Sequence, residues 1–318
     1  MIELSQNPNP NEVPDLMEKT TTNDNIISPD SLLQKPPEKP MVDPNVAARA
    51  HQEVSLRETL RNIKKTVVVQ SGKGGVGKST VTYNLALAFA RAGFEVGILD
   101  ADVTGPSIPL MAGLEGQFAK IEGRKILPTK TNGIHIISID LLLNQDTPVI
   151  WRGPLKIAAI RQFLSDVKWP PLDVLFIDLP PGTSDEPLTV AQLFDNISGT
   201  VIVTTPQKVA THDVRKSIGF ATKVGMPILG IIENMSSLTC PHCGNKVPVF
   251  KEGGGRELAD KLGLVFLGDI PLEPQVVIQA DEGKPSALLE TEFAKSFNQI
   301  AKKVAKLLQL KLEENNGA

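Results

Sequence analysis

Aromatic residues and cysteine are scarce in this sequence, and long apolar runs are missing from it. Aromatic residues make up 4% of the 318 residues, and there are two cysteines. No stretch of about 18 apolar residues occurs, so a transmembrane helix is excluded. The first residues have neither the basic nor the apolar region of a secretory signal, and we therefore expect a cytoplasmic protein with no membrane partner.

An excess of positive charge is missing as well. The chain has 33 lysine and arginine residues against 36 aspartate and glutamate residues, a formal net charge of -3. Proteins that bind nucleic acid through their overall charge are normally basic. We therefore expect no nucleic-acid partner.

The beginning of the sequence lacks the residues that build a hydrophobic core. No glycine, phenylalanine, tryptophan or tyrosine precedes Gly72, whereas proline and asparagine are frequent in residues 1–50. Such a segment buries too little apolar surface to offset the entropy lost on ordering. We predict a disordered Pro/Asn-rich segment over residues 1–50 and a folded domain over residues 51–318, with short helical turns possible in residues 44–63.

From Thr66 onward, short β-branched runs alternate with amphipathic stretches. The expected strands are residues 66–70, 96–100, 134–139, 174–178, 200–205, 228–233 and 265–268, and the expected helices are residues 79–92, 154–164, 210–224 and 256–262. This alternation predicts an α/β fold with a doubly wound, mostly parallel sheet. A last amphipathic helix, with its apolar face formed between Leu289 and Leu308, is expected to dock on the sheet; a membrane-surface helix is the alternative.

A glycine-rich loop follows the first expected strand. It comprises Gly72, Lys73, Gly74, Gly75, Val76, Gly77, Lys78, Ser79 and Thr80, which match the Walker A spacing between a strand and a helix. In such a loop the backbone amides surround phosphate oxygens. Lys78 is expected to bind the β and γ phosphates, and Ser79 to bind Mg²⁺ through its hydroxyl. The loop therefore predicts a P-loop ATPase domain that takes ATP and Mg²⁺.

Carboxylates end two other expected strands. Asp178 follows an apolar strand and is expected to hold the Mg²⁺ shell. The turn at residues 180–183 then suits a switch loop beside the γ-phosphate. Asp102 lies just beyond the strand that ends at Asp100, where catalytic groups of parallel sheets collect. It is expected to place the attacking water or to touch the Mg²⁺ shell, and a plain turn or capping role is the alternative.

The residues from Lys73 to Ser79 resemble the deviant Walker A motif of the MinD, ParA and nitrogenase iron-protein class. With the stretches at residues 100–109, 151–154, 177–185 and 233–236, they make the sequence similar to the Mrp/ApbC family of iron-sulfur carrier ATPases. The resemblance implies that Lys73 reaches the nucleotide of the partner subunit in a homodimer. It also implies that Asn234, at the end of a strand, recognises adenine, with a structural cap as the alternative.

The sequence departs from this family at a few positions. Thr104 stands where tyrosine is common, and Leu155 stands where methionine is common. Neither residue is expected to touch the nucleotide chemistry. The proline-rich beginning also replaces the small N-terminal domain that many bacterial members carry.

The two cysteines, Cys240 and Cys243, form a Cys-x-x-Cys motif. Pro241 stiffens the turn and Gly244 lets backbone amides approach the second sulfur, as in a metal-binding knuckle. A [4Fe-4S] cluster or a zinc ion usually takes four protein ligands, which two subunits together would supply. We therefore predict a [4Fe-4S] cluster that bridges the two-fold axis of a homodimer. Structural zinc with His242 as a further ligand, and thiol redox exchange, are the alternatives.

Together these features predict an ATPase that binds an iron-sulfur cluster on its cysteines and transfers it to apo-proteins. Water would attack the γ-phosphate, with Lys73, Lys78 and Mg²⁺ neutralising charge and Asp102 placing the water. A partition or positioning ATPase of the MinD/ParA type is the main alternative, but it leaves the cysteine motif without a use. A nitrogenase-like electron donor is a third, although that class takes its cysteines from separated positions.

Overall fold

The computed structural model describes residues 44–143, 153–183, 185–194, 197–240, 243, 245–247, 249–250, 252–284 and 291–311. The chain divides into two compact units, Met1–Pro44 and Asn45–Ala318. Nearly all of the segment predicted to be disordered lies outside the described residues. The second unit contains the sheet, its helices and the phosphate loop.

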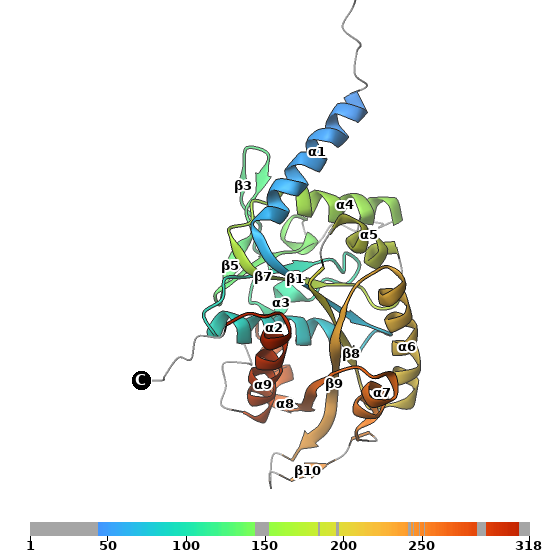
Figure 1. The fold of residues 1–318 in the computed structure, drawn as a ribbon. Coiled ribbons are helices and arrows are strands. Elements are labelled where there is room, and N and C mark those ends of the chain that lie inside the picture. The colour runs from blue at the N-terminus through green and yellow to red at the C-terminus, as the bar shows by residue number, and fades with distance from the viewer. Residues whose placement is uncertain are drawn as a thin grey trace, which may run out of the picture. The chain divides into compact units, whose positions relative to one another are not determined.

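A mostly parallel sheet of nine strands forms the centre of this unit (Figure 1). Its order is β10-β9-β8-β1-β7-β2-β6-β5, and β11 also pairs with β9. Its strands are β1 (Ile63–Ser71), β2 (Val96–Asp100), β5 (Thr129–Thr131), β6 (Ile134–Ile137), β7 (Leu172–Asp178), β8 (Gly199–Thr204), β9 (Ile228–Thr239), β10 (Lys246–Val247) and β11 (Phe266–Leu272). The terminal strands β5 and β10 are antiparallel to their neighbours, whereas the interior pairs are parallel. The predicted α/β fold class is confirmed.

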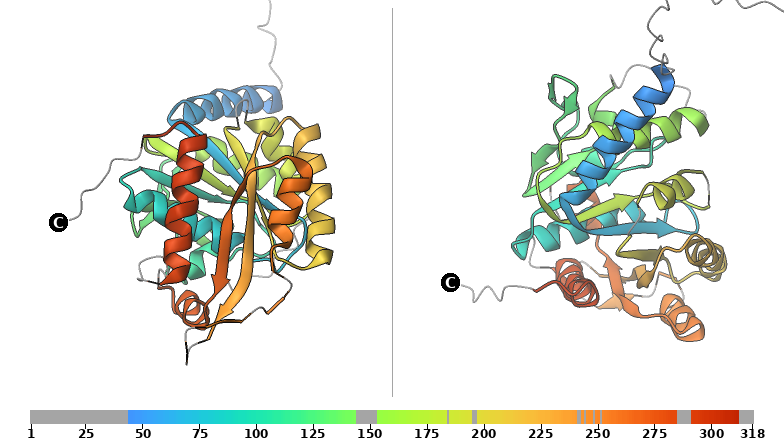
Figure 2. Two further views of the ribbon diagram at one scale, coloured as in Figure 1. Left: turned by 60° about the horizontal axis from the view of Figure 1, so that its bottom comes forward. Right: turned by 45° about the horizontal axis from the view of Figure 1, so that its top comes forward.

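Helices lie on both faces of this sheet, and its central strands β1, β7 and β8 are buried over most of their length. The helices of the described residues are α1 (Pro44–Arg61), α2 (Lys78–Arg91), α3 (Ile108–Met111), α4 (Gly153–Asp166), α5 (Asp185–Leu193), α6 (Lys208–Lys223), α7 (Gly254–Leu262), α8 (Pro274–Asp281) and α9 (Glu292–Leu307), with a short 3-10 helix at Ile139–Leu141. Figure 2 shows α9 on one side of the β9 and β11 arrows and α6 and α7 on the other. Among the described residues, no helix is both long and apolar enough to cross a bilayer.

The C-terminal helix docks on the sheet as its amphipathic pattern predicts. Phe293, Phe297, Ile300 and Val304 of α9 are buried, and they belong to the main hydrophobic core. Thr291 caps the helix, since its hydroxyl accepts a hydrogen bond from the Ala294 amide at 3.3 Å. The apolar face that a membrane-surface helix would need is therefore used inside the domain.

Several elements differ from the sequence-based expectation. Helix α1 spans Pro44–Arg61, one continuous helix where the sequence allowed only short helical turns, and the domain boundary at residue 50 stays a prediction. Proline is favoured in the first turn of a helix, and Leu56 and Leu60 of α1 pack against the core. Strand β9 runs on to Thr239 instead of ending at Glu233. A small antiparallel pair, β3 (Ile121–Glu122) with β4 (Lys125–Ile126), has no counterpart among the predicted elements.

Candidate nucleotide site and cysteine turn

The phosphate loop connects β1 to α2, the place where a P-loop must lie. Gly75 and Gly77 have φ angles of 76° and 80°, values that favour glycine. Gly72 is required for another reason, because a Cβ atom there would lie 2.5 Å from the backbone of Asp213 in α6. Gly74 and Gly75 are exposed, Val76 is buried, and Thr80 is half-buried in the first turn of α2. The loop thus presents its backbone at the carboxyl end of a central strand, where anions bind.

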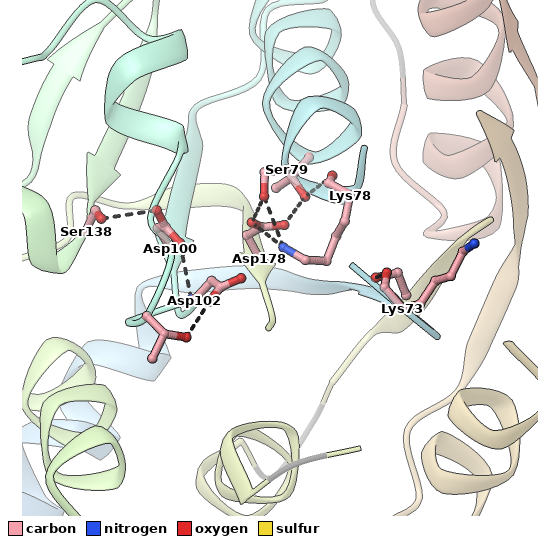
Figure 3. A network of polar contacts seen from close by, with 10 residues as sticks. Lys73, Lys78, Ser79, Asp100, Asp102, Ser138 and Asp178 are labelled. Carbon is pink, nitrogen blue, oxygen red and sulfur yellow. Dashed lines mark hydrogen bonds and ion pairs between the residues drawn. The ribbon is translucent and has the colours of Figure 1, made fainter. Parts of the chain in front are cut away.

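The side chains of Lys78, Ser79 and Asp178 converge on one point (Figure 3). The Lys78 Nζ atom lies 2.6 Å from Asp178 Oδ2, and the Ser79 hydroxyl donates to the same oxygen at 2.6 Å. Lys78 and Asp178 are 6% and 0% exposed, so this ion pair is buried. The Lys78 ammonium also donates to Ser79 Oγ at 3.1 Å. The structure therefore brings together the three residues that the sequence assigns to phosphate and Mg²⁺.

Asp100 and Asp102 form a second carboxylate group beside this cluster. Asp100 ends β2 directly opposite Asp178 in β7. Burial, and then the charge of Asp178, raise the pKa of Asp100 well above its usual value. The Asp100 carboxylate accepts hydrogen bonds from the Ser138 hydroxyl at 3.1 Å and from the Asp102 amide at 3.2 Å. Sequence reasoning assigned no role to Asp100 or Ser138, because their contact joins the end of β2 to the residue that follows β6.

Asp102 itself is half-buried in the loop after β2. Its Oδ1 atom accepts a hydrogen bond from the Thr104 hydroxyl at 3.2 Å. Thr104 therefore contacts a residue proposed to act in hydrolysis, and the expectation that it does not itself touch the chemistry stays untested.

Lys73 stands apart from the Asp178 cluster. Figure 3 shows its side chain directed away from Lys78 and Asp178. The Lys73 ammonium lies 3.4 Å from Gln207 Oε1, at the start of α6, and the Ser71 hydroxyl donates to the Lys73 carbonyl at 3.0 Å. Its side chain is half-buried. This direction agrees with a contact outside its own loop, and the role in the partner subunit stays a prediction.

The turn at residues 180–183 is tied to β1. Its Gly182 amide donates to the Ser71 carbonyl at 2.9 Å, and its Gly182 carbonyl accepts from Gln70 Nε2 at 3.1 Å. Gln70 is fully buried, a position that the motif pattern does not single out. Of the other motif positions, Trp151, Arg152 and Ser184 lie outside the described residues.

Asn234 lies against the phosphate loop. Its Nδ2 atom donates to the Val76 carbonyl at 2.9 Å, and its amide fills the space where a Cβ atom on Gly77 would lie. The sequence predicts Asn234 at the end of a strand. Because β9 continues to Thr239, Asn234 instead lies inside the strand. The backbone does change direction there, since Met235 has a φ angle of 56°. Adenine recognition by Asn234 stays a prediction.

The cysteine turn begins where β9 ends. Cys240 is half-buried and Cys243 is exposed, and neither of these two cysteines, both described, is in a disulfide. The Cys240 amide donates to the Asn245 carbonyl at 2.9 Å, and β10 then pairs with the end of β9. Within the described part of the chain, no group of three or more His, Cys, Asp or Glu residues could hold a metal ion. Pro241, His242 and Gly244 lie outside that part, and so does the zinc alternative that uses His242.

The donor set beside the loop fits a magnesium nucleotide. A buried ammonium, a hydroxyl and a carboxylate converge at Lys78, Ser79 and Asp178. Carboxylate and hydroxyl oxygens are the protein ligands that Mg²⁺ accepts beside phosphate. When bound, the ion would neutralise charge that develops on the transferred phosphoryl group.

Comparison with known proteins identifies relatives over most of the chain. The profile of the family described as "ParA: NUBPL iron-transfer P-loop NTPase" matches residues 62–305. The "Iron-sulfur cluster carrier protein" of Methanocaldococcus jannaschii is 48% identical over 266 residues, which are 83% of this chain and 92% of the relative. The "Cytosolic Fe-S cluster assembly factor CFD1" of Yarrowia lipolytica is 46% identical over 255 residues, 77% of this chain and 88% of the relative.

A solved structure shares the fold at a similar level of identity. It is the nucleotide-binding protein of Archaeoglobus fulgidus in complex with ADP and with cobalt, which is 41% identical and has a TM-score of 0.67. The similarity covers 77% of this chain and 96% of that one. The family match at residues 62–305 includes the phosphate loop, Asp178 and the cysteine turn. This chain therefore belongs to the NUBPL iron-transfer P-loop NTPase family.

Proposed function

We propose that the protein is an ATP-dependent carrier that holds a [4Fe-4S] cluster between two copies of the chain and transfers it to apo-proteins. One observation carries the proposal, namely that β9 contacts the phosphate loop and ends at the cysteine turn. Asn234 of this strand donates to the Val76 carbonyl, and Cys240 directly follows its last residue, Thr239.

The separation of the two sites follows from strand geometry. From Asn234 to Cys240 a strand rises by about 3.3 Å per residue, so the cysteines lie up to about 20 Å from the loop contact. Nucleotide and cluster can then be bound at once without sharing a ligand. One strand that touches both sites gives the ATP state a route to the cysteine turn, because a shift of the loop acts on Asn234 and through the strand on its end.

The number of thiolates supports a homodimer. One chain offers Cys240 and Cys243, and the exposure of Cys243 leaves its sulfur open to a neighbouring molecule. Four thiolates are the usual ligand set of a [4Fe-4S] cluster, so two chains related by a two-fold axis complete it. In this arrangement the cluster is a cargo at the surface, where an acceptor protein can reach it.

ATP hydrolysis in this proposal uses the phosphate loop, two carboxylates and a lysine of the partner subunit. Lys78 and Ser79 lie where the β and γ phosphates and Mg²⁺ bind in this class of loop, and Asp178 completes the metal shell. Asp102 orients the attacking water, and Lys73 of the partner subunit adds positive charge at the γ-phosphate in the closed dimer. Positioning and charge neutralisation, and not covalent chemistry, then carry the catalysis.

The relatives support the class of cargo and the compartment. One is named as an iron-sulfur cluster carrier, and another is named as a cytosolic assembly factor. By this similarity we place the protein in the cytoplasm and take apo iron-sulfur proteins as its acceptors. A partition ATPase of the MinD/ParA type would have the same loop but no use for the cysteine turn.

The decisive experiment removes one thiol at a time. Cys240→Ala and Cys243→Ala each leave at most two thiolates at the two-fold axis, too few to hold the cluster. After anaerobic reconstitution with iron and sulfide, both variants should lose nearly all bound iron and the visible absorbance of the cluster, and should still bind ATP. Val247→Ala is the matched control, because Val247 is 45% exposed in β10 beside the turn and has no sulfur.

Two results would contradict this function. Full iron loading of both cysteine variants would exclude a bridging cluster. Loss of zinc in place of iron, measured on anaerobically purified protein, would identify the turn as a structural zinc site.

A further inference from the structure

Thr82 has an unusual contact for a threonine inside a helix. It lies in α2 one turn after Ser79 and is completely buried. Its Oγ1 atom is 2.6 Å from Asp178 Oδ1 and 3.0 Å from the Lys78 carbonyl oxygen. The Walker A pattern ends before Thr82 and gives it no role.

The hydrogen count indicates which of the two contacts matters. A threonine hydroxyl has one proton, whereas an ionised carboxylate and a carbonyl oxygen can only accept. The Lys78 carbonyl is also in position to accept the ordinary helical hydrogen bond from the backbone amide of Thr82 itself. The carboxylate contact is the shorter one, so the Thr82 proton is assigned to Asp178 Oδ1.

The two oxygens of Asp178 therefore have different partners. Oδ2 accepts from Lys78 and Ser79, the groups that a bound nucleotide and Mg²⁺ would draw toward themselves. Among the hydrogen bonds of the described residues, Oδ1 accepts only from Thr82. Once Lys78 and Ser79 turn to the phosphates and the ion, the Thr82 hydroxyl is the donor that still holds the carboxylate.

We propose that Thr82 is a positioning residue that fixes Asp178 through Oδ1, so that Oδ2 faces the Mg²⁺ position. This role rests on the proposed use of Asp178 in the Mg²⁺ shell. It acts on the metal-dependent part of nucleotide binding, because the carboxylate does not itself touch the phosphates. The competing interpretation is a buried threonine whose hydroxyl merely bonds back to the helix, as many helical threonines do.

The test uses three variants of the full-length chain. Thr82→Val removes the hydroxyl and keeps the shape, and Thr82→Ser restores the donor. Thr222→Val controls for loss of the helical back-bond alone, because the exposed Thr222 of α6 donates to the Ile218 carbonyl at 2.9 Å. Binding of a fluorescent ATP analogue is measured in EDTA and across a Mg²⁺ titration, and the melting temperature is measured without nucleotide.

Thr82→Val should bind the analogue as the parent does in EDTA, while the Mg²⁺ concentration for half-maximal enhancement of binding should rise about tenfold, as expected when a hydrogen bond to a charged group is lost. Thr82→Ser and Thr222→Val should keep the parent's Mg²⁺ dependence. If Thr82→Val does not fold, Thr82→Ala replaces it with the same expectation.

Two outcomes overturn the proposal in distinguishable ways. A Thr82→Val protein with a lower melting temperature and the parent's Mg²⁺ dependence would show that Thr82 is only a buried helical threonine, with the nucleotide site intact. A parent chain whose nucleotide binding does not respond to Mg²⁺ would overturn the proposed function itself.

Discussion

The buried ion pair between Lys78 and Asp178 makes a quantitative prediction for the protein without nucleotide. The two groups are 2.6 Å apart and 6% and 0% exposed, so removal of either one leaves the other charge in a poorly solvated place. Breaking a buried pair in this way usually costs about 3 to 5 kcal/mol of folding free energy. We expect the low end of this energy range here, because the Ser79 and Thr82 hydroxyls still donate to Asp178 when the Lys78 ammonium is removed.

We expect Lys78→Met and Asp178→Asn each to lower the free energy of unfolding by about 3 kcal/mol. The double variant should be destabilised by less than the sum, with a coupling of about 2 kcal/mol, because it leaves neither charge unpaired. Lys78→Met should also lose ATP binding, since no cation then faces the β and γ phosphates.

Thermal and denaturant unfolding in EDTA without nucleotide gives these values. For a domain of this size 1 kcal/mol corresponds to about 2 to 4 °C in melting temperature, so each single variant should melt about 6 to 12 °C lower. The matched control is Lys64→Met, because Lys64 and Asp173 are 2.7 Å apart but 71% and 24% exposed. It should change stability by less than about 1 kcal/mol. Additive effects of the two site variants would refute the reasoning.

Two further predictions concern the loop lysine and the single tyrosine. Lys73→Ala should keep ATP binding and lose most hydrolysis, since its proposed contact forms only in the closed dimer; hydrolysis at the parent rate would exclude the role in the partner subunit. Burial raises the pKa of Tyr83 from 10.0 to about 12, so the absorbance of ionised tyrosine should emerge near pH 12 in the folded protein. Between pH 10 and 12 the Tyr83 hydroxyl therefore keeps its proton in the folded state and loses it in the unfolded state. The free energy of unfolding should be highest below pH 10 and should fall by about 3 kcal/mol as the pH rises to 12. The fall should be absent in Tyr83→Phe, and its persistence there would assign it to other groups.

The sequence by itself determined the local parts of this protein. The alternation of apolar runs and amphipathic stretches predicted the α/β sheet. The spacing of apolar residues within a segment indicates whether that segment is a strand or a helix, whatever it packs against. The loop from Gly72 to Thr80 was identified for the same reason, since the spacing of a P-loop is fixed within a single turn. The ends of β2 and β7 likewise revealed Asp102 and Asp178.

Only the tertiary structure decided which of these parts meet. The contact between Thr82 and Asp178 joins α2 to β7, and the contact between Asn234 and Val76 joins β9 to the loop. The length of β9 was misjudged because its last residues are held by pairing with β10 and β11, which local pattern does not encode. Such contacts depend on the order of strands in the sheet, and that order follows from burying the whole core at once and not from any one segment.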